Sequence, residues 1–147
     1  MGAKGEAIAE EVNISFEDFK NQIIEDFRIA SISRETSLLG RREVLTGKAK
    51  FGIFGDGKEL AQLALAKQFQ NGDHRSGYYR DQTIMFSIGQ LTVQQYFAAL
   101  YAHTDLEFEP TSGGRQMGGH YATRYLNEDG SWKNLMESKN SSADISP

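Results

Sequence analysis

The stretch Ser76–Gln82 carries the residue types best suited to holding an anion. Its two tyrosines run directly into Arg80, and an apolar segment, Thr83–Ile88, follows. A guanidinium binds a phosphate through two parallel hydrogen bonds, and a phenol donates another. A helix starting at Asp81 would add backbone N–H groups and the positive end of its dipole. The stretch therefore predicts a phosphate-binding turn, although similar residues also form ordinary strand ends with one surface charge.

A histidine that follows a glycine-rich loop is the second candidate for chemistry. Residues 110–120 contain the pairs Gly113-Gly114 and Gly118-Gly119 and end at His120. Paired glycines allow positive φ angles and a close approach of the backbone to a ligand. A histidine there can exchange a proton near neutral pH. The three histidines of the chain form no two-histidine metal spacing, so we predict no metal ligands among them.

The first third of the chain predicts one long helix. Ser15 is a good N-cap, and an apolar stripe follows it at helical spacing. The helix would run to Leu45 and stop at Gly47, unless Gly40 divides it. The stripe consists of Phe16, Phe19, Ile23, Phe27 and Ala30. A stripe this long and aromatic indicates packing within the chain or against another subunit.

Shorter elements are predicted in the middle of the chain. The segment Lys58–Phe69 is apolar on almost all sides, which is typical of a helix buried on more than one face. Asp81–Ile88 predicts a short helix, and Thr92 caps another helix that reaches about Ala102. The alternating segment Lys50–Phe54 predicts a short strand.

The last third of the chain is polar and rich in glycine. We expect a mobile loop region over about residues 104–142, after which Ile145–Pro147 ends the chain with no helix or strand completed. With a flexible tail over residues 1–14, the domain would cover residues 15–147.

Composition excludes several classes of protein. The chain has 147 residues, of which 39% are hydrophobic and 24% charged, so one folded domain is expected. Its formal net charge of −4 gives no reason to expect nucleic acid or membrane as a partner. It has no cysteine and no apolar segment of membrane-spanning length. We therefore expect a cytoplasmic protein without a disulfide framework or a thiolate metal site.

Residues 37–124 carry an ordered set of motifs. The set consists of Gly47-Lys48 at a helix end, Gly57-Lys58-Glu59 opening an Ala/Leu helix, Gly72-Asp73 before Tyr79-Arg80-Asp81, and Gly114-Arg115-Gln116-Met117 before His120-Tyr121. In this order and spacing the chain resembles the α subunit of the thiamine-diphosphate-dependent 2-oxo acid dehydrogenases. The last motif is most similar to that of the branched-chain (2-oxoisovalerate) members.

The resemblance implies roles for four residues. Tyr79 and Arg80 would contact the diphosphate of the cofactor, and His120 would lie at the active site. Ser146 would begin a further segment that contacts the cofactor. No role is implied for Asp81. The cofactors would be thiamine diphosphate and magnesium, with the magnesium ligands expected beyond this chain.

One local motif suggests a cofactor site but lacks the asparagine that would complete it. In this family a Gly-Asp-Gly starts the magnesium-binding segment, which an asparagine closes further on. Gly55-Asp56-Gly57 is followed by Asn71, which is too early, and by Asn127, which is far too late. We therefore interpret Asp56 as a turn residue or helix cap. The chain is then expected to be an N-terminal fragment of the α region, or of an α–β fusion, and inactive alone.

The expected fold is a partial α/β thiamine-diphosphate-binding fold that is mostly helical over this range. Expected partners are a β subunit or fused β region, a lipoyl-bearing acyltransferase and a 2-oxo acid, in an oligomer. The competing interpretation is a non-catalytic, helix-rich interaction domain. In that case the aromatic stripe is the working surface and the glycine-rich segment is a linker.

Overall fold

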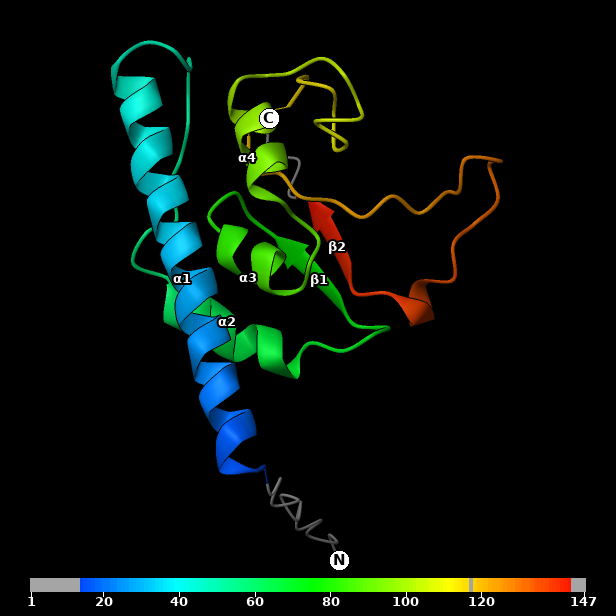
Figure 1. Cartoon of the computed structure of the whole chain (residues 1–147). Helices are drawn as coiled ribbons and strands as arrows, with labels where there is room; N and C mark the ends of the chain where they lie inside the picture. Colours follow the sequence, from blue (N-terminus) through cyan, green and yellow to red (C-terminus); the bar gives the residue numbers. More distant parts are fainter. Residues whose placement is uncertain (1–13, 117, 144–147) are drawn as a thin grey trace, which may run out of the picture.

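The structure is a computed structural model that describes residues 14–116 and 118–143 (Figure 1). Its elements are α1 (Phe16–Leu45), α2 (Glu59–Gln68), β1 (His74–Gly77), α3 (Gln82–Ser87), α4 (Val93–Leu100), the 3-10 helix η1 (Leu135–Glu137) and β2 (Asn140–Ala143). Helices dominate, and β1 and β2 form a small parallel sheet. This mixture is compatible with a partial α/β domain. Ser146 and the N-terminal residues 1–13 lie outside the described residues.

α1 begins and ends where the sequence predicts. The backbone N–H of Asp18 donates to Ser15 Oγ at 3.1 Å, which caps the first turn. At the other end, Gly47 has φ +77° and its N–H donates to the carbonyl of Val44 at 3.0 Å. Gly40 does not divide the helix. A Cβ at Gly40 would lie 2.6 Å from the ring of Phe54, so glycine is needed for close packing.

α2 is less buried than its composition predicts. Leu63 is 4% exposed, whereas Leu60 is 80% and Leu65 is 57% exposed. The expectation of burial on more than one face was therefore wrong for the described structure. α2 packs against α1 and α3 (Figure 1), and its buried residues Glu59, Leu63 and Ala66 share one side of the helix. Lys67 forms an ion pair with Asp26 of α1 at 2.5 Å.

α3 lies at the centre of the molecule. Gln82 and Thr83 are fully buried, and their side chains hydrogen-bond to Ser37 at 2.5 Å and Ser33 at 2.6 Å, both from α1. The apolar core forms around it from Ala66, Ile84, Met85, Leu91, Tyr96 and Tyr121. α4 completes this core and starts with the capping box of Thr92 and Gln95. The predicted helices Asp81–Ile88 and Val93 onward are thus confirmed.

Two strand predictions were wrong. Lys50–Phe54 forms no strand, although its residues alternate. Phe54 instead folds back over Gly52, where an added Cβ would lie 2.6 Å from the Phe54 ring. In contrast, β2 follows Lys139, where no strand was expected, and pairs with β1 in the register His74 to Asn140.

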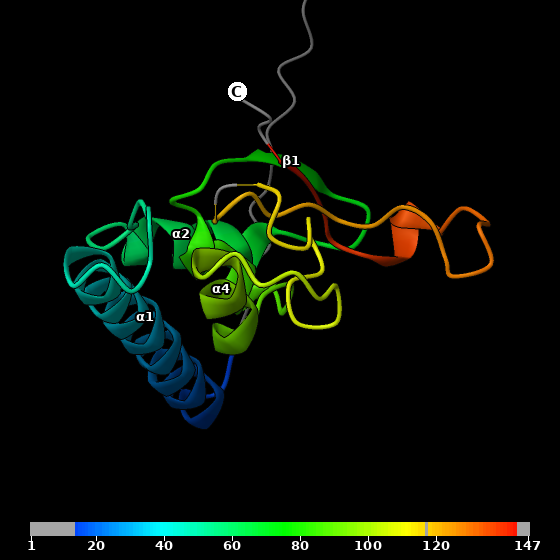
Figure 2. The same cartoon turned by 90° about the horizontal axis from the view of Figure 1, so that it is seen from above.

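Figures 1 and 2 show α1 at one side of the molecule and the segment 124–139 reaching out at the opposite side. The N-terminal half of α1 extends below the other elements (Figure 1). Among the helices described, none has the length and apolar character needed to cross a membrane.

Candidate functional site

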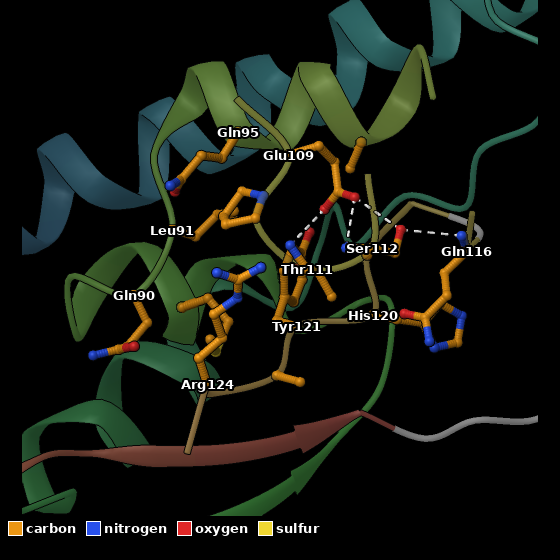
Figure 3. A pocket seen from close by; sticks show the side chains of 15 residues that line it. Gln90, Leu91, Gln95, Glu109, Thr111, Ser112, Gln116, His120, Tyr121 and Arg124 are labelled. Atoms are coloured by element: carbon orange, nitrogen blue, oxygen red, sulfur yellow. Dashed lines mark hydrogen bonds between the residues drawn. The ribbon is translucent and has the colours of Figure 1, made fainter. Parts of the chain in front are cut away.

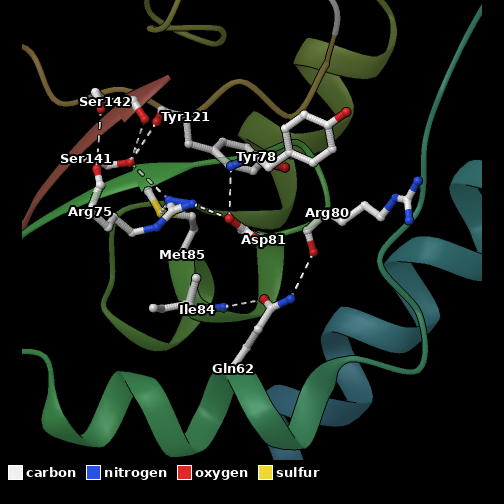
Figure 4. A network of polar contacts seen from close by, with 10 residues as sticks. All are labelled: Gln62, Arg75, Tyr78, Arg80, Asp81, Ile84, Met85, Tyr121, Ser141 and Ser142. Atoms are coloured by element: carbon white, nitrogen blue, oxygen red, sulfur yellow. Dashed lines mark hydrogen bonds and ion pairs between the residues drawn. The ribbon is translucent and has the colours of Figure 1, made fainter. Parts of the chain in front are cut away.

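The turn after β1 is shaped by a partly buried ion pair. Asp81 Oδ2 accepts hydrogen bonds from Arg75 Nη2 at 2.7 Å and from the N–H of Tyr78 at 2.9 Å. The Arg75 side chain is only 9% exposed and also donates to Ser141 Oγ of β2 at 3.0 Å (Figure 4). Asp81, for which the sequence implied no role, therefore fixes the backbone from which the next side chains project.

α2 holds the same turn from the other side. Gln62 Nε2 donates to the carbonyl of Arg80 at 2.9 Å, and Gln62 Oε1 accepts from the N–H of Ile84 at 3.0 Å. Ile84 lies in the first turn of α3, so this N–H is not available to a ligand. The helix start therefore offers less to an anion than the sequence predicts, and the side chains must supply the contacts.

The turn presents Tyr79 and Arg80 together. Figure 4 shows the Arg80 side chain pointing away from the buried network, opposite to Arg75. Its guanidinium carbon lies 5.6 Å from the centre of the Tyr79 ring. The Tyr78 hydroxyl donates to the Tyr79 hydroxyl at 2.5 Å. Two phenols and a guanidinium thus occupy one edge of the molecule.

His120 joins this group from a distant part of the sequence. Its ring centre lies 5.9 Å from that of Tyr79 in an edge-on arrangement, and its side chain is buried. Gly119 makes this approach feasible, because it has φ +97° and an added Cβ would lie 2.8 Å from Tyr79. The fold thus brings Tyr79, Arg80 and His120 together, while Ser146 lies outside the described residues. We call these three residues the Tyr79 cluster.

Glu109 organises the loop that leads to His120. Its carboxylate accepts hydrogen bonds from the N–H groups of Thr111 at 3.0 Å, Ser112 at 2.8 Å and Gly114 at 3.0 Å. The Ser112 hydroxyl donates to it at 2.8 Å and accepts from the N–H of Gln116 at 3.1 Å (Figure 3). The glycine-rich segment is therefore anchored at its start.

These contacts change the acidity of Glu109. Burial raises the pKa of the carboxyl, but the N–H of Gly114, the Ser112 hydroxyl and the N–H groups of Ser112 and Thr111 stabilise the charged form more strongly. The net effect lowers the pKa below its ordinary value. Sequence reasoning missed Glu109. The only signal was an acidic residue directly before Pro110 and the turn residues that follow it.

A cavity of about 70 Å³ lies between α4 and this loop, and Arg124 points into it (Figure 3). Gln95 and Glu109 contribute to its lining. That volume holds only a few water molecules and is too small for a thiamine cofactor.

Asp56 is a turn residue, as predicted, and not a helix cap. It forms an ion pair with Arg41 at 2.5 Å, and α2 starts after Lys58 without a side-chain cap. Within residues 14–116 and 118–143, no group of three or more His, Cys, Asp or Glu side chains is arranged to hold a metal ion.

Comparisons of the chain with protein-family models, with curated proteins and with solved structures found no match.

Proposed function

We propose that this chain is the N-terminal part of the α region of a thiamine-diphosphate-dependent 2-oxo acid dehydrogenase, most similar to the branched-chain type. The observation that carries the proposal is the convergence of Tyr79, Arg80 and His120. The resemblance assigns all three to one active site, and His120 comes from a segment far from the adjacent pair Tyr79 and Arg80 in the sequence. A chance likeness of short motifs would give no reason for them to meet.

The side chains fit a diphosphate chemically. Arg80 is exposed, and among the described residues no carboxylate lies within ion-pair distance of its guanidinium. Arg75, in contrast, is committed to Asp81. Because the Tyr78 hydroxyl donates to Tyr79, the Tyr79 proton remains available for a phosphate oxygen. Arg80 would then neutralise charge through its bidentate fork.

His120 has the position of a proton-handling group. Its ring contacts Tyr79 and is buried, so Gly119 and Tyr79 fix its position relative to the proposed diphosphate site. A histidine held in this way would orient or protonate the substrate during decarboxylation. Bound thiamine diphosphate supplies the carbanion chemistry itself.

The rest of the machinery is proposed to lie outside this chain. Magnesium ligands, the β region and a lipoyl-bearing acyltransferase would be needed to convert a 2-oxo acid and transfer its acyl group. The 147-residue chain alone is therefore proposed to be inactive.

One observation favours the competing class, a non-catalytic interaction domain. Phe16 and Phe27 of α1 are 79% and 74% exposed. The other part of that interpretation, a linker over the glycine-rich segment, is disfavoured. Glu109 holds that segment by four hydrogen bonds, which a linker would not need.

The test is an assay of the complete gene product, co-expressed with its β subunit if that is separate. We expect decarboxylation of branched-chain 2-oxo acids that requires thiamine diphosphate and magnesium. A reading frame beyond Pro147 should also encode a Gly-Asp-Gly segment closed by an asparagine. A complete gene product that lacks this segment and decarboxylates no 2-oxo acid would refute the proposal.

A further inference from the structure

The cavity between α4 and the glycine-rich loop contains an arginine that has no partner among the described residues. Arg124 points into this cavity (Figure 3), and no described carboxylate lies within ion-pair distance of its guanidinium. The preceding residue fixes the backbone: the N–H of Thr123 donates to the carbonyl of Ser141 at 2.8 Å, and Thr123 Oγ1 accepts from the N–H of Ser141 at 2.8 Å. The backbone beside Arg124 is therefore held against β2 before any ligand binds.

Glu109 lines the same cavity, but its carboxylate is already engaged. It is 3% exposed and accepts its hydrogen bonds from the loop, three from backbone N–H groups and one from the Ser112 hydroxyl. These donors balance much of its charge, so Arg124 stays available to an anion. The lining also includes Gln95, whose Oε1 accepts from the N–H of Thr92, while its Nε2 group makes no hydrogen bond within the described part of the chain.

The cavity has the size of a small acid. At about 10–15 Å³ for one water molecule, its volume of about 70 Å³ gives room for about five atoms of that size. Met85 and Leu91, which are 2% and 8% exposed, add apolar surface to the lining. A guanidinium beside an apolar wall matches a carboxylate that carries a short hydrocarbon chain.

We propose that this cavity, which we call the Arg124 cavity, binds a short aliphatic carboxylate. The guanidinium would hold the carboxylate by two parallel hydrogen bonds, and Gln95 Nε2 would donate another. The hydrocarbon chain would lie on Met85 and Leu91. A singly charged anion is favoured over phosphate, because the negative charge of Glu109 in the same lining would repel a second charge on the ligand. This inference goes beyond the proposed function, since any acid of this class satisfies it.

The first test uses isovalerate, which has a branched chain and a carboxylate but no 2-oxo group to support decarboxylation. It is titrated into the complete gene product without thiamine diphosphate and at constant ionic strength, while NMR follows the methyl resonances of Met85 and Leu91. We expect saturable shifts with a dissociation constant on the order of 1 mM. Arg124→Ala should raise that constant about tenfold or more, because a charge-assisted contact is lost.

Arg115→Ala is the matched control. Arg115 is an exposed arginine of the same loop, but it does not line the cavity. Its removal should leave the affinity for isovalerate unchanged. Arg124→Lys should recover only part of the affinity, because an ammonium lacks the bidentate fork. Arg124 is also exposed, so thermal melts of all three variants should match the wild type.

Two further ligands identify the source of the carboxylate. Binding of 2-oxoisovalerate about tenfold tighter than isovalerate would assign the cavity to 2-oxo acids, and equal binding would make it a general carboxylate site. Both results support the proposal. Arg80→Ala should keep the wild-type affinity for isovalerate, so a failure at the Arg124 cavity is distinguishable from a failure at the Tyr79 cluster. No saturable shift, an affinity unchanged in Arg124→Ala, or displacement of isovalerate by equimolar inorganic phosphate would overturn the proposal.

Discussion

The Arg75–Asp81 ion pair supports the turn that presents Tyr79 and Arg80. Both charges look like surface residues in the sequence, yet the Arg75 side chain is 9% exposed and also contacts Ser141. Truncating one partner of a buried pair leaves the other charge without compensation. Removing one partner should therefore destabilise the fold by more than the intact ion pair stabilises it.

We predict that Asp81→Ala lowers the free energy of unfolding by about 1–3 kcal/mol, because the largely buried Arg75 guanidinium loses its carboxylate partner. Arg80→Ala is the control from the same turn. Its guanidinium is exposed, so the change should stay within about 0.5 kcal/mol. Urea unfolding followed by circular dichroism measures both. Equal stability of the two variants would show that the ion pair does not support the turn.

Glu109 should make stability depend on pH in acid. Its folded pKa is lowered, so its contribution is complete above the pKa of an unfolded glutamate, about 4.3. That contribution is lost as the pH falls through the lower folded value. At pH 7, Glu109→Gln should lower the free energy of unfolding by about 1–3 kcal/mol. The difference in the free energy of unfolding between Glu109→Gln and wild type should become smaller toward pH 3.

The measurement is urea unfolding from pH 7 to pH 3, with Glu107→Gln as the control, since Glu107 is an exposed neighbour. The control should follow the wild type at every pH. A gap between Glu109→Gln and wild type that stays constant over the whole range would contradict the assigned role.

At the scale of elements, α2 offers a matched pair of leucines. Leu63 faces the core and is 4% exposed, whereas Leu60 of the same helix is 80% exposed. Leu63→Asp would bury a charge among apolar neighbours and should cost several kcal/mol. Leu60→Asp should change stability by less than about 0.5 kcal/mol. If the melting temperature falls by the same amount in both variants, Leu63 does not face the core and α2 is oriented differently.

The helices could be predicted because their signals are local. Ser15 and Thr92 cap with their own side chains, and Gly47 supplies the positive φ that ends α1. The sheet could not be predicted in this way. Asn140–Ala143 has polar and small residues without β-propensity, and its partner β1 lies far back in the sequence. Lys50–Phe54 alternates correctly but has no strand beside it within the described residues.

The candidate site was predictable to a similar extent. Tyr79, Arg80 and His120 could be found because they lie in motifs, and the Gly119 backbone angle explains how they meet. Asp81, Gln62 and Glu109 could not, since their roles depend on tertiary hydrogen bonds that no local pattern encodes.

At the scale of the whole molecule, residues 140–142 of the expected mobile region 104–142 lie in β2, and the rest of that region remains a prediction of mobility. Hydrogen bonds to Glu109 hold its start, and the N–H of Thr123 donates to the carbonyl of Ser141 at 2.8 Å. We expect rapid amide exchange between these anchors, and slow exchange over Lys58–Phe69, where α2 packs on α3. Hydrogen exchange followed by NMR would contradict this if both regions were protected alike.

We propose that the Tyr79 cluster binds the diphosphate of thiamine diphosphate, and the most direct test is an NMR titration of the complete gene product, in the presence of magnesium, with that cofactor. Resonances of residues 78–80 and 119–120 should shift, with thiamine lacking the diphosphate as the negative control. Arg80→Ala removes a charge-assisted contact of about 1.5–3 kcal/mol. Its dissociation constant should therefore rise by roughly ten- to a hundred-fold.

Two further variants make the titration specific. Arg80→Lys should recover only part of the affinity, because an ammonium keeps the charge but loses the bidentate fork. Arg124→Ala should bind as the wild type does, since Arg124 points into the small cavity on the other side of the loop (Figure 3). We expect shifts confined to the cluster and a weakened affinity of the Arg80→Ala variant. Equal dissociation constants in wild type and Arg80→Ala, or no shifts at these residues, would contradict it.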